Sequence, residues 1–265
     1  MVLEVAADAG QVMDHVDVYV ISEFCGPYSY NKHTQLHRQL WAGIQYYAFG
    51  CGPVTSNLAE AGGFWYADPS ARSPDVQFHF LPGSGLEAGV TQLGEHGCTL
   101  NSAFLRPRSI GSVKLASADP SAHPLIDPNY FAEDYDRRMS IAGLRLAREI
   151  MAQPAFRPYL RAERLPGAEL QGDAELLAYA RQHGKTDYHP VGTCKMGVDG
   201  VAVVDPELKV RGLAGLRVCD SSIMPRLVSS NTNAPTLMIG EKAADLVRGV
   251  VQRQVAAVKE LQAAT

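Results

Sequence analysis

The sequence predicts an α+β (mixed α/β) fold, on three observations. Residues 76–81 alternate apolar and polar side chains, as a half-buried strand does. Residues 136–151 carry apolar side chains at helical spacing, with arginines on the other faces. Segments of the two kinds are mixed along the chain, an order that favours a mixed fold over a β-sandwich.

The other elements follow from the same patterns. Strands are expected at residues 16–21, 99–105 and 112–116, and a helix at residues 34–49, ended by Gly50. A further helix is expected from Asp173, as its N-cap, to His183, with Gly184 as its stop. The glycines between residues 82 and 97 leave no room for a helix, so this stretch is expected to be a loop.

The last third is expected to contain short strands and one long helix. The apolar runs at residues 201–204, 208–210 and 216–220 predict strands, and the last of them ends in Asp220. Pro235 fits the first turn of a helix that is expected to reach about residue 256, with Thr232 and Asn233 as capping residues.

Composition excludes several classes of protein. The 265 residues are 46% hydrophobic and 20% charged, which is ordinary for a folded chain and excludes collagen-like, coiled-coil and disordered classes. A formal net charge of −4 argues against binding nucleic acid through its phosphates. There is no apolar run of transmembrane length. The five scattered cysteines favour free thiols in a reducing compartment such as the cytoplasm, with peripheral membrane association left open.

Two segments carry the chemistry. They are Tyr188–Gly197, which reads YHPVGTCKMG, and residues 220–245, which include SSNTNAPTLMIGEKAAD. Both resemble the C-terminal region of the glucose–methanol–choline (GMC) flavin oxidoreductases, and GLRVCDSSIMP at residues 215–225 agrees with that family as well. Shorter upstream matches are Met13–His15, Glu60–Phe64, Leu105–Ser109 and Pro124–Tyr130. The resemblance covers roughly residues 11–250.

The resemblance implies FAD-dependent oxidation of a primary alcohol, choline-like or other, to the aldehyde. A hydroxyl has a pKa of ~16, and imidazole one of ~6.5. Full deprotonation before hydride loss would therefore cost roughly 12 kcal/mol, so the proton must leave as the hydride departs or other donors must hold the developing alkoxide. His189 matches the family's active-site histidine and is expected to be the base. Asn231 matches the second active-site position, where an amide donates a hydrogen bond but takes no proton.

Further site residues are implied by the resemblance. The start of the last helix, with its partial positive charge, would face the flavin and stabilise its reduced form. The alternative role for the residues at this helix start is ordinary capping. The alternative role for His189, if its motif is ignored, is a structural or surface one. A carboxylate and aromatic walls would bind a choline-like substrate, although aromatic clusters more often belong to a core. The expected cofactor-binding residues are Asp220, Ser221, Asn233, Ala234 and Pro235, and the expected substrate-binding residues are Glu60, Phe64 and Tyr188, with Trp65 as a further candidate wall.

The FAD-binding GxGxxG unit, which lies at the N-terminus of family members, is not present in this sequence. The chain therefore resembles a C-terminal half. The expected organisation is a partial start at residues 1–14, a substrate-binding domain with an antiparallel sheet backed by helices at 15–185, a catalytic and flavin-facing segment at 186–256 and a tail at 257–265. The expected partners are an alcohol and an N-terminal FAD-binding half or other subunit. The alternative is a non-catalytic remnant that binds no FAD alone. No metal site is expected.

Overall fold

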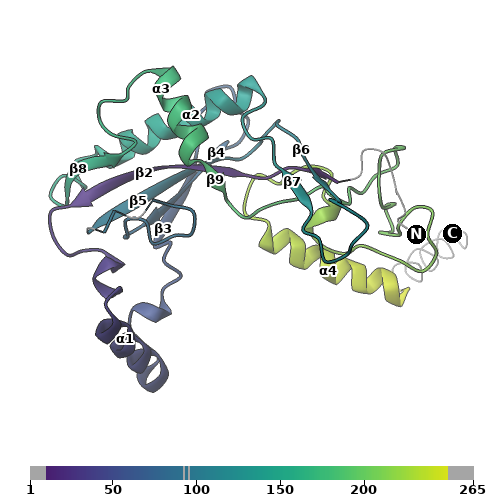
Figure 1. Cartoon of the computed structure of the whole chain (residues 1–265), viewed down its shortest axis with the longest axis horizontal. Helices are drawn as coiled ribbons and strands as arrows, with labels where there is room; N and C mark the ends of the chain where they lie inside the picture. Colours follow the sequence, from purple (N-terminus) through teal and green to yellow (C-terminus); the bar gives the residue numbers. More distant parts are fainter. Residues whose placement is uncertain (1–9, 92, 95, 250–265) are drawn as a thin grey trace, which may run out of the picture. The chain divides into compact units, whose positions relative to one another are not determined.

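The computed structural model describes residues 10–91, 93, 94 and 96–249 (Figure 1). The chain forms two compact units. One comprises residues 15–108 and 131–187, and we call it the sheet unit. The other comprises the described residues up to 14, residues 109–130 and the described residues from 188 onward, and we call it the C-terminal unit. Residues 109–130, which were expected in the same domain as residues 15–108, belong to the C-terminal unit.

The sheet unit is built on a six-stranded antiparallel sheet in the order β3-β4-β5-β2-β8, with β9 also paired to β2. Its central strands, β2, β4 and β5, are largely buried. The strand bounds are β2 Val16–Phe24, β3 Ala61–Trp65, β4 Val76–Leu81, β5 Gly97–Phe104, β8 Leu160–Leu165 and β9 Lys185–Thr186.

Two helices cover one face of this sheet. They are α2 (Asp134–Met151) and α3 (Asp173–His183), and both contact β2 (Figure 1). A Cβ atom placed on Gly143 of α2 would lie 2.2 Å from Ser102 Oγ on β5, so a larger residue here would require the Ser102 side chain or the helix to shift. The apolar core of the unit lies between these two layers and includes Val18, Phe104, Leu144 and Leu176.

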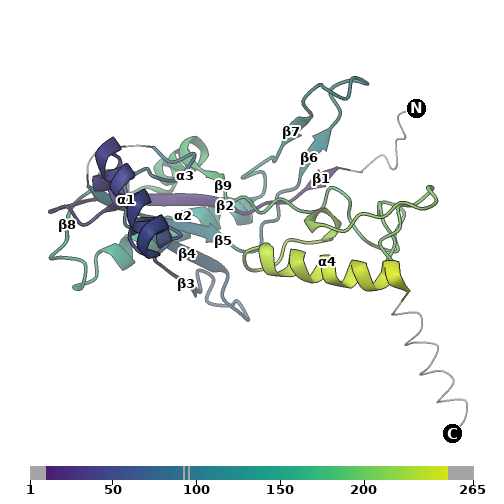
Figure 2. The ribbon, with the colours of Figure 1, turned by 90° about the horizontal axis from the view of Figure 1, so that it is seen from below.

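A third helix, α1 (Leu36–Phe49), lies on the opposite side of the sheet, as the turned view in Figure 2 also shows. It ends where Gly50 adopts a left-handed conformation (φ 63°), which confirms the predicted stop. Most of its apolar side chains are exposed, and Tyr47 reaches 89% exposure. Short 3₁₀ turns flank it, η1 at Tyr30–His33 and η2 at Pro53–Thr55.

The C-terminal unit has a small three-stranded sheet and one long helix. The sheet order is β1-β6-β7, with β1 Gln11–Val12, β6 Gly111–Lys114 and β7 Leu125–Asp127. The helix α4 runs from Asn233 to Arg248, and the turn η3 spans Ser221–Ile223. The apolar core of this unit gathers Val191, Val204, Met224, Ile239 and Ala243. Among the described residues, no helix is long and apolar enough to cross a membrane.

Most sequence-based predictions of helices and strands are confirmed within one or two residues, but the short strands after residue 200 are wrong. Residues 201–204, 208–210 and 216–220 make only isolated bridges, such as Val204 with Val210. The reason is local. Leu208 has a positive φ of 65°, and the backbone amides of Glu207 and Lys209 donate to the Asp205 carboxylate, so these amides cannot donate to a neighbouring strand.

The capping residues predicted at two helix starts also need correction. Asp173 is the first residue of α3, and Gly172 holds the N-cap position, where its amide donates to Glu175. Thr232 is at the N-cap of α4 but caps with no side-chain bond, and Asn233 already lies within the helix. Gly249 closes α4 in a left-handed conformation (φ 68°). The predicted continuation over residues 250–256 lies outside the described residues.

All five cysteines are free, as predicted. Cys98 lies in β5 with no exposed surface, and this burial raises the pKa of its thiol to about 12. Because the thiolate is the nucleophile, Cys98 should resist Ellman's reagent at pH 8 in the folded chain and react only after denaturation. The exposed Cys25 and Cys51 should react at once. The variant Cys98→Ser should lack the one thiol that reacts only after denaturation. Modification of Cys98 in the folded chain as fast as that of Cys25 would contradict its burial.

Candidate active site

The predicted catalytic pair meets in the C-terminal unit. The side-chain amide nitrogen of Asn231, Nδ2, lies 3.2 Å from His189 Nε2. Since Nδ2 can only donate, His189 Nε2 accepts this bond, and its lone pair is the basic site of the ring. His189 is 8% exposed, whereas Asn231 is exposed. One proton acceptor and one hydrogen-bond donor are thus brought together from residues 42 positions apart.

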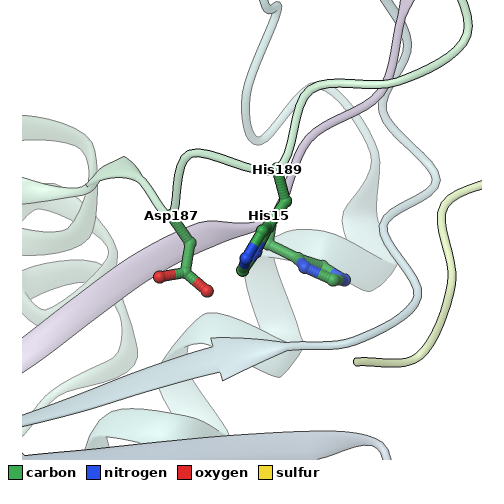
Figure 3. Close-up of side chains that lie close together, drawn as sticks. All are labelled: His15, Asp187 and His189. Atoms are coloured by element: carbon green, nitrogen blue, oxygen red, sulfur yellow. The ribbon is translucent and has the colours of Figure 1, made fainter. Parts of the chain in front are cut away.

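The segment that carries His189 has an unusual backbone. Tyr188, which precedes it, has a φ of 59°, a conformation that costs a bulky residue free energy. The backbone amide of His189 donates to Asp14 Oδ1 at 2.9 Å. Figure 3 shows the His189 side chain together with those of His15 and Asp187, which precedes His189 by two residues on the same segment.

The predicted cofactor-binding residues gather around two short stretches of the C-terminal unit. Asp220 is the N-cap of η3, where its Oδ1 accepts the Ser222 amide at 2.9 Å. The hydroxyl of Ser221 donates to the carbonyl of Pro190, the residue after His189, at 3.3 Å. Asn233, Ala234 and Pro235 form the first turn of α4, directly after Asn231 and Thr232.

The predicted substrate-binding residues are divided between the units. Glu60 and Phe64 belong to the sheet unit, and Tyr188 to the C-terminal unit. Glu60 is exposed, and its Oε1 accepts hydrogen bonds from the hydroxyls of Tyr30 and Ser56. The Ser56 and Tyr30 bonds hold the pKa of Glu60 below its usual value, while the bond to Glu60 raises the pKa of Tyr30. Phe64 and Tyr188 are 46% and 57% exposed.

The sequence reasoning missed a buried ionic cluster in the sheet unit. Lys185 Nζ lies 3.2 Å from Asp17 Oδ2 and 2.8 Å from Glu87 Oε1. Asn101 Nδ2 donates to the same two acids, at 3.2 and 2.8 Å. The one signal in the sequence was an acid, Asp17, inside the otherwise apolar stretch 16–21.

The acids outnumber the bases in this cluster. Burial, and then the Asp187 carboxylate, raise the pKa of Asp17 well above its usual value, against the lowering effect of Lys185. Burial alone would lower the pKa of Lys185, but Asp17 and Glu87 outweigh it, and the net direction is upward. Ligand atoms of Asp17, His79 and Asp187 lie within 4.8 Å of one another, an arrangement that could hold a cation.

Comparison with known proteins places this geometry in a family. The family model described as GMC oxidoreductase matches residues 107–240, which include His189, Asn231 and the start of α4. The chain therefore belongs to the GMC oxidoreductase family. This confirms the family predicted from the motifs, and the observed mixture of helices with antiparallel sheets agrees with the solved structures of that family.

The relatives are longer than this chain. An oxygen-dependent choline dehydrogenase of Klebsiella pneumoniae is 43% identical over 238 residues, which are 90% of this chain and 43% of the relative. An alcohol dehydrogenase [acceptor] of Pseudomonas putida is 46% identical over 74% of this chain and 36% of its own length. Among solved structures, a formate oxidase aligns with a TM-score of 0.80 at 25% identity, covering 91% of this chain and 47% of its own. The chain thus spans less than half the length of these relatives.

The ionic cluster yields a prediction about stability. Replacing Lys185 by Met leaves Asp17 buried beside other acids without its cation, and breaking such a pair from one side costs about 3–5 kcal/mol. Because the pKa of Asp17 is raised in the folded chain, the penalty should shrink as the pH falls and Asp17 takes up a proton, and grow as the pH rises. Urea unfolding at several pH values measures it.

The matched control is Lys209→Met. Lys209 pairs with Glu207 at the surface, where its side chain is 46% exposed, so its loss should cost less than about 1 kcal/mol. Equal effects of the two substitutions would show that the Lys185 cluster contributes no more than a surface pair.

Proposed function

We propose that this chain is the C-terminal, catalytic part of a FAD-dependent oxidoreductase that oxidises a primary alcohol, choline-like or other, to the aldehyde. The observation that carries the proposal is the contact of His189 Nε2 with Asn231 Nδ2, inside the segment that matches the GMC family. A choline dehydrogenase and an alcohol dehydrogenase among the relatives support this class of substrate.

In this proposal His189 is the base. Its Nε2 lone pair accepts the hydroxyl proton of the alcohol, which requires the alcohol oxygen to approach within about 2.6–3.2 Å and to displace the Asn231 amide from Nε2. Asn231 donates from Nδ2 to the same oxygen and stabilises the negative charge that develops there. Because the amide cannot take up a proton, the two residues cannot exchange these roles.

The residues at the start of α4 suit the flavin. The first amides of a helix have no partner within the helix, and together they carry about half a positive charge. Thr232 makes no side-chain capping bond, and Pro235 has no amide hydrogen, so Asn233 and Ala234 offer the amides of this turn. They would hold the edge of the isoalloxazine that becomes negative on reduction. FAD, when bound, supplies the acceptor for the hydride that leaves the carbon of the alcohol.

A FAD-binding half is the proposed partner. Exposed apolar side chains in both units support it, since patches of this kind mark interaction surfaces. In the sheet unit they lie on α1, where Leu36 is 72% and Leu40 is 62% exposed. In the C-terminal unit they lie on α4, where Leu237 and Met238 are 64% and 59% exposed.

The visible spectrum of the purified chain tests the cofactor and the partner. Absorbance near ~370 and ~450 nm that is lost on adding an alcohol is expected for a bound, reducible flavin. If these bands are absent from the chain alone and appear after an N-terminal half is added, the enzyme is split. Their absence from both preparations would contradict the proposal and leave the remnant that binds no FAD.

The substitution His189→Ala tests the base. In the preparation that oxidises the alcohol, turnover should fall by at least ~100-fold while the flavin bands remain, because only the proton acceptor is lost. The control is His123→Ala, which removes an exposed histidine of the same unit and should leave turnover unchanged. Near-normal turnover of His189→Ala would remove His189 from its proposed role.

A further inference from the structure

The backbone pairing breaks where His189 lies. β9 pairs with β2, and the Asp187 amide next donates to the His15 carbonyl at 3.0 Å. The following exchange joins Met13 and Val191, with bonds of 3.0 and 2.9 Å. Between these two points, one strand contributes a single residue and the other contributes three.

The three residues on the longer side are 188–190, and the single residue opposite them is Asp14. This is a special bulge, with three residues opposite one, an irregularity that is often found where a functional side chain must be presented. Tyr188 makes the turn with its positive φ of 59°. The Asp14 carboxylate takes the backbone amide of His189 in place of a strand carbonyl, at 2.9 Å.

Asp14 is itself held from a second direction. It is 7% exposed, and its other oxygen, Oδ2, accepts a hydrogen bond from the hydroxyl of Tyr130. The turn before Tyr130 is fixed in the same way. The Asn129 amide donates to Asp127 Oδ1 at 2.9 Å, and its side chain donates to the Ile110 carbonyl at 3.0 Å.

We propose that Asp14 and Tyr130 are positioning residues for His189, with Tyr130 fixing the Asp14 carboxylate and Asp14 fixing the backbone of the bulge. The proposal rests on the role of His189 as the base. It gives a function to two short sequence motifs, Met13–His15 and Pro124–Tyr130, which lie more than 100 positions apart.

The physical reason is the strain of the bulge. A left-handed conformation at a bulky residue such as Tyr188 persists only where the surroundings enforce it. A buried backbone amide that loses its acceptor costs free energy, so the Asp14 oxygen that accepts the His189 amide stabilises the bulge. Without it the bulge can relax, and a shift of about 1 Å in a catalytic group can lower the rate by ~100-fold.

The first measurement is hydrogen exchange of the His189 amide in the full chain, by NMR. Asp14→Ala should speed this exchange by about tenfold or more relative to the Val204 amide, which donates to a backbone carbonyl of the same unit. Asp14→Asn, which keeps an acceptor oxygen, should restore most of the protection. Tyr130→Phe, which removes only the hydroxyl, should have a smaller effect of the same sign.

The second measurement is kinetic, in the preparation that oxidises the alcohol. Asp14→Ala should lower kcat by ~10- to 100-fold with little change in KM, since the base is displaced while other substrate contacts remain. The control is Asp205→Ala, which also removes a carboxylate that accepts backbone amides of this unit, at 2.9 Å. It should change neither the His189 exchange nor kcat.

The outcomes separate this proposal from the proposed function. Unchanged exchange at His189 in Asp14→Ala, or an equal increase in Asp205→Ala, would overturn the positioning role even if His189 proves to be the base. Faster exchange with an unchanged kcat would also overturn it. If Asp14→Ala does not fold, Asp14→Asn and Tyr130→Phe decide between the two explanations. If the geometry of the bulge matters, and not the carboxylate charge alone, Tyr130→Phe should speed exchange of the His189 amide more than Asp14→Asn does. The reverse order would contradict the proposed part of Tyr130.

Discussion

The pairing of residues 12–17 with residues 185–191 is the constraint on which the candidate site depends. On the sheet-unit side, Asp17 and Lys185 are opposite each other, and their side chains form a buried ion pair. On the other side, Met13 and Val191 exchange backbone bonds. Within the C-terminal unit, His189 is held by the pairing of Met13 with Val191 and by the bond of its own amide to the Asp14 carboxylate.

The apolar core of the C-terminal unit brings the second member of the pair into place. Val191 follows His189 by two residues, and Ile239 and Ala243 lie further along the chain from Asn231, on the buried face of α4. All three side chains belong to one core cluster. Packing of non-polar side chains therefore fixes both the loop of His189 and the start of α4. The 3.2 Å contact between the two polar groups is a consequence of that packing.

The sequence predicted the motifs that carry the two candidate catalytic residues, and it missed the contacts that depend on how strands pair. The motif around His189 and the motif around Asn231 each identify a residue type in a recognisable context, and the structure brings these two side chains together. The pairing of Asp17 with Lys185 joins residues 168 positions apart, and no periodicity signals it. The bond from the His189 amide to Asp14 spans 175 positions and needs a bulge that only strand pairing reveals.

The errors have the same physical origin. The stretch after residue 200 has strand-like composition, but the Asp205 carboxylate takes backbone amides that a ladder would need, and Leu208 turns the chain with its positive φ. Composition measures the preference of side chains for a pleated surface, and it does not count which backbone donors are already used. A carboxylate likewise replaces a strand carbonyl as the acceptor at His189, whose backbone amide donates to Asp14.

The sheet unit departs from an ordinary arrangement of polarity at a few residues. Asp17 and Asn101 have almost no exposed surface, whereas Leu36 and Tyr47 of α1 are 72% and 89% exposed. Buried acids lower stability unless they are paired, and exposed apolar side chains favour association. The buried acid Asp17 is paired with Lys185, and the exposed apolar side chains of α1 suit a contact surface. The proposed FAD-binding half would cover apolar surface of this kind.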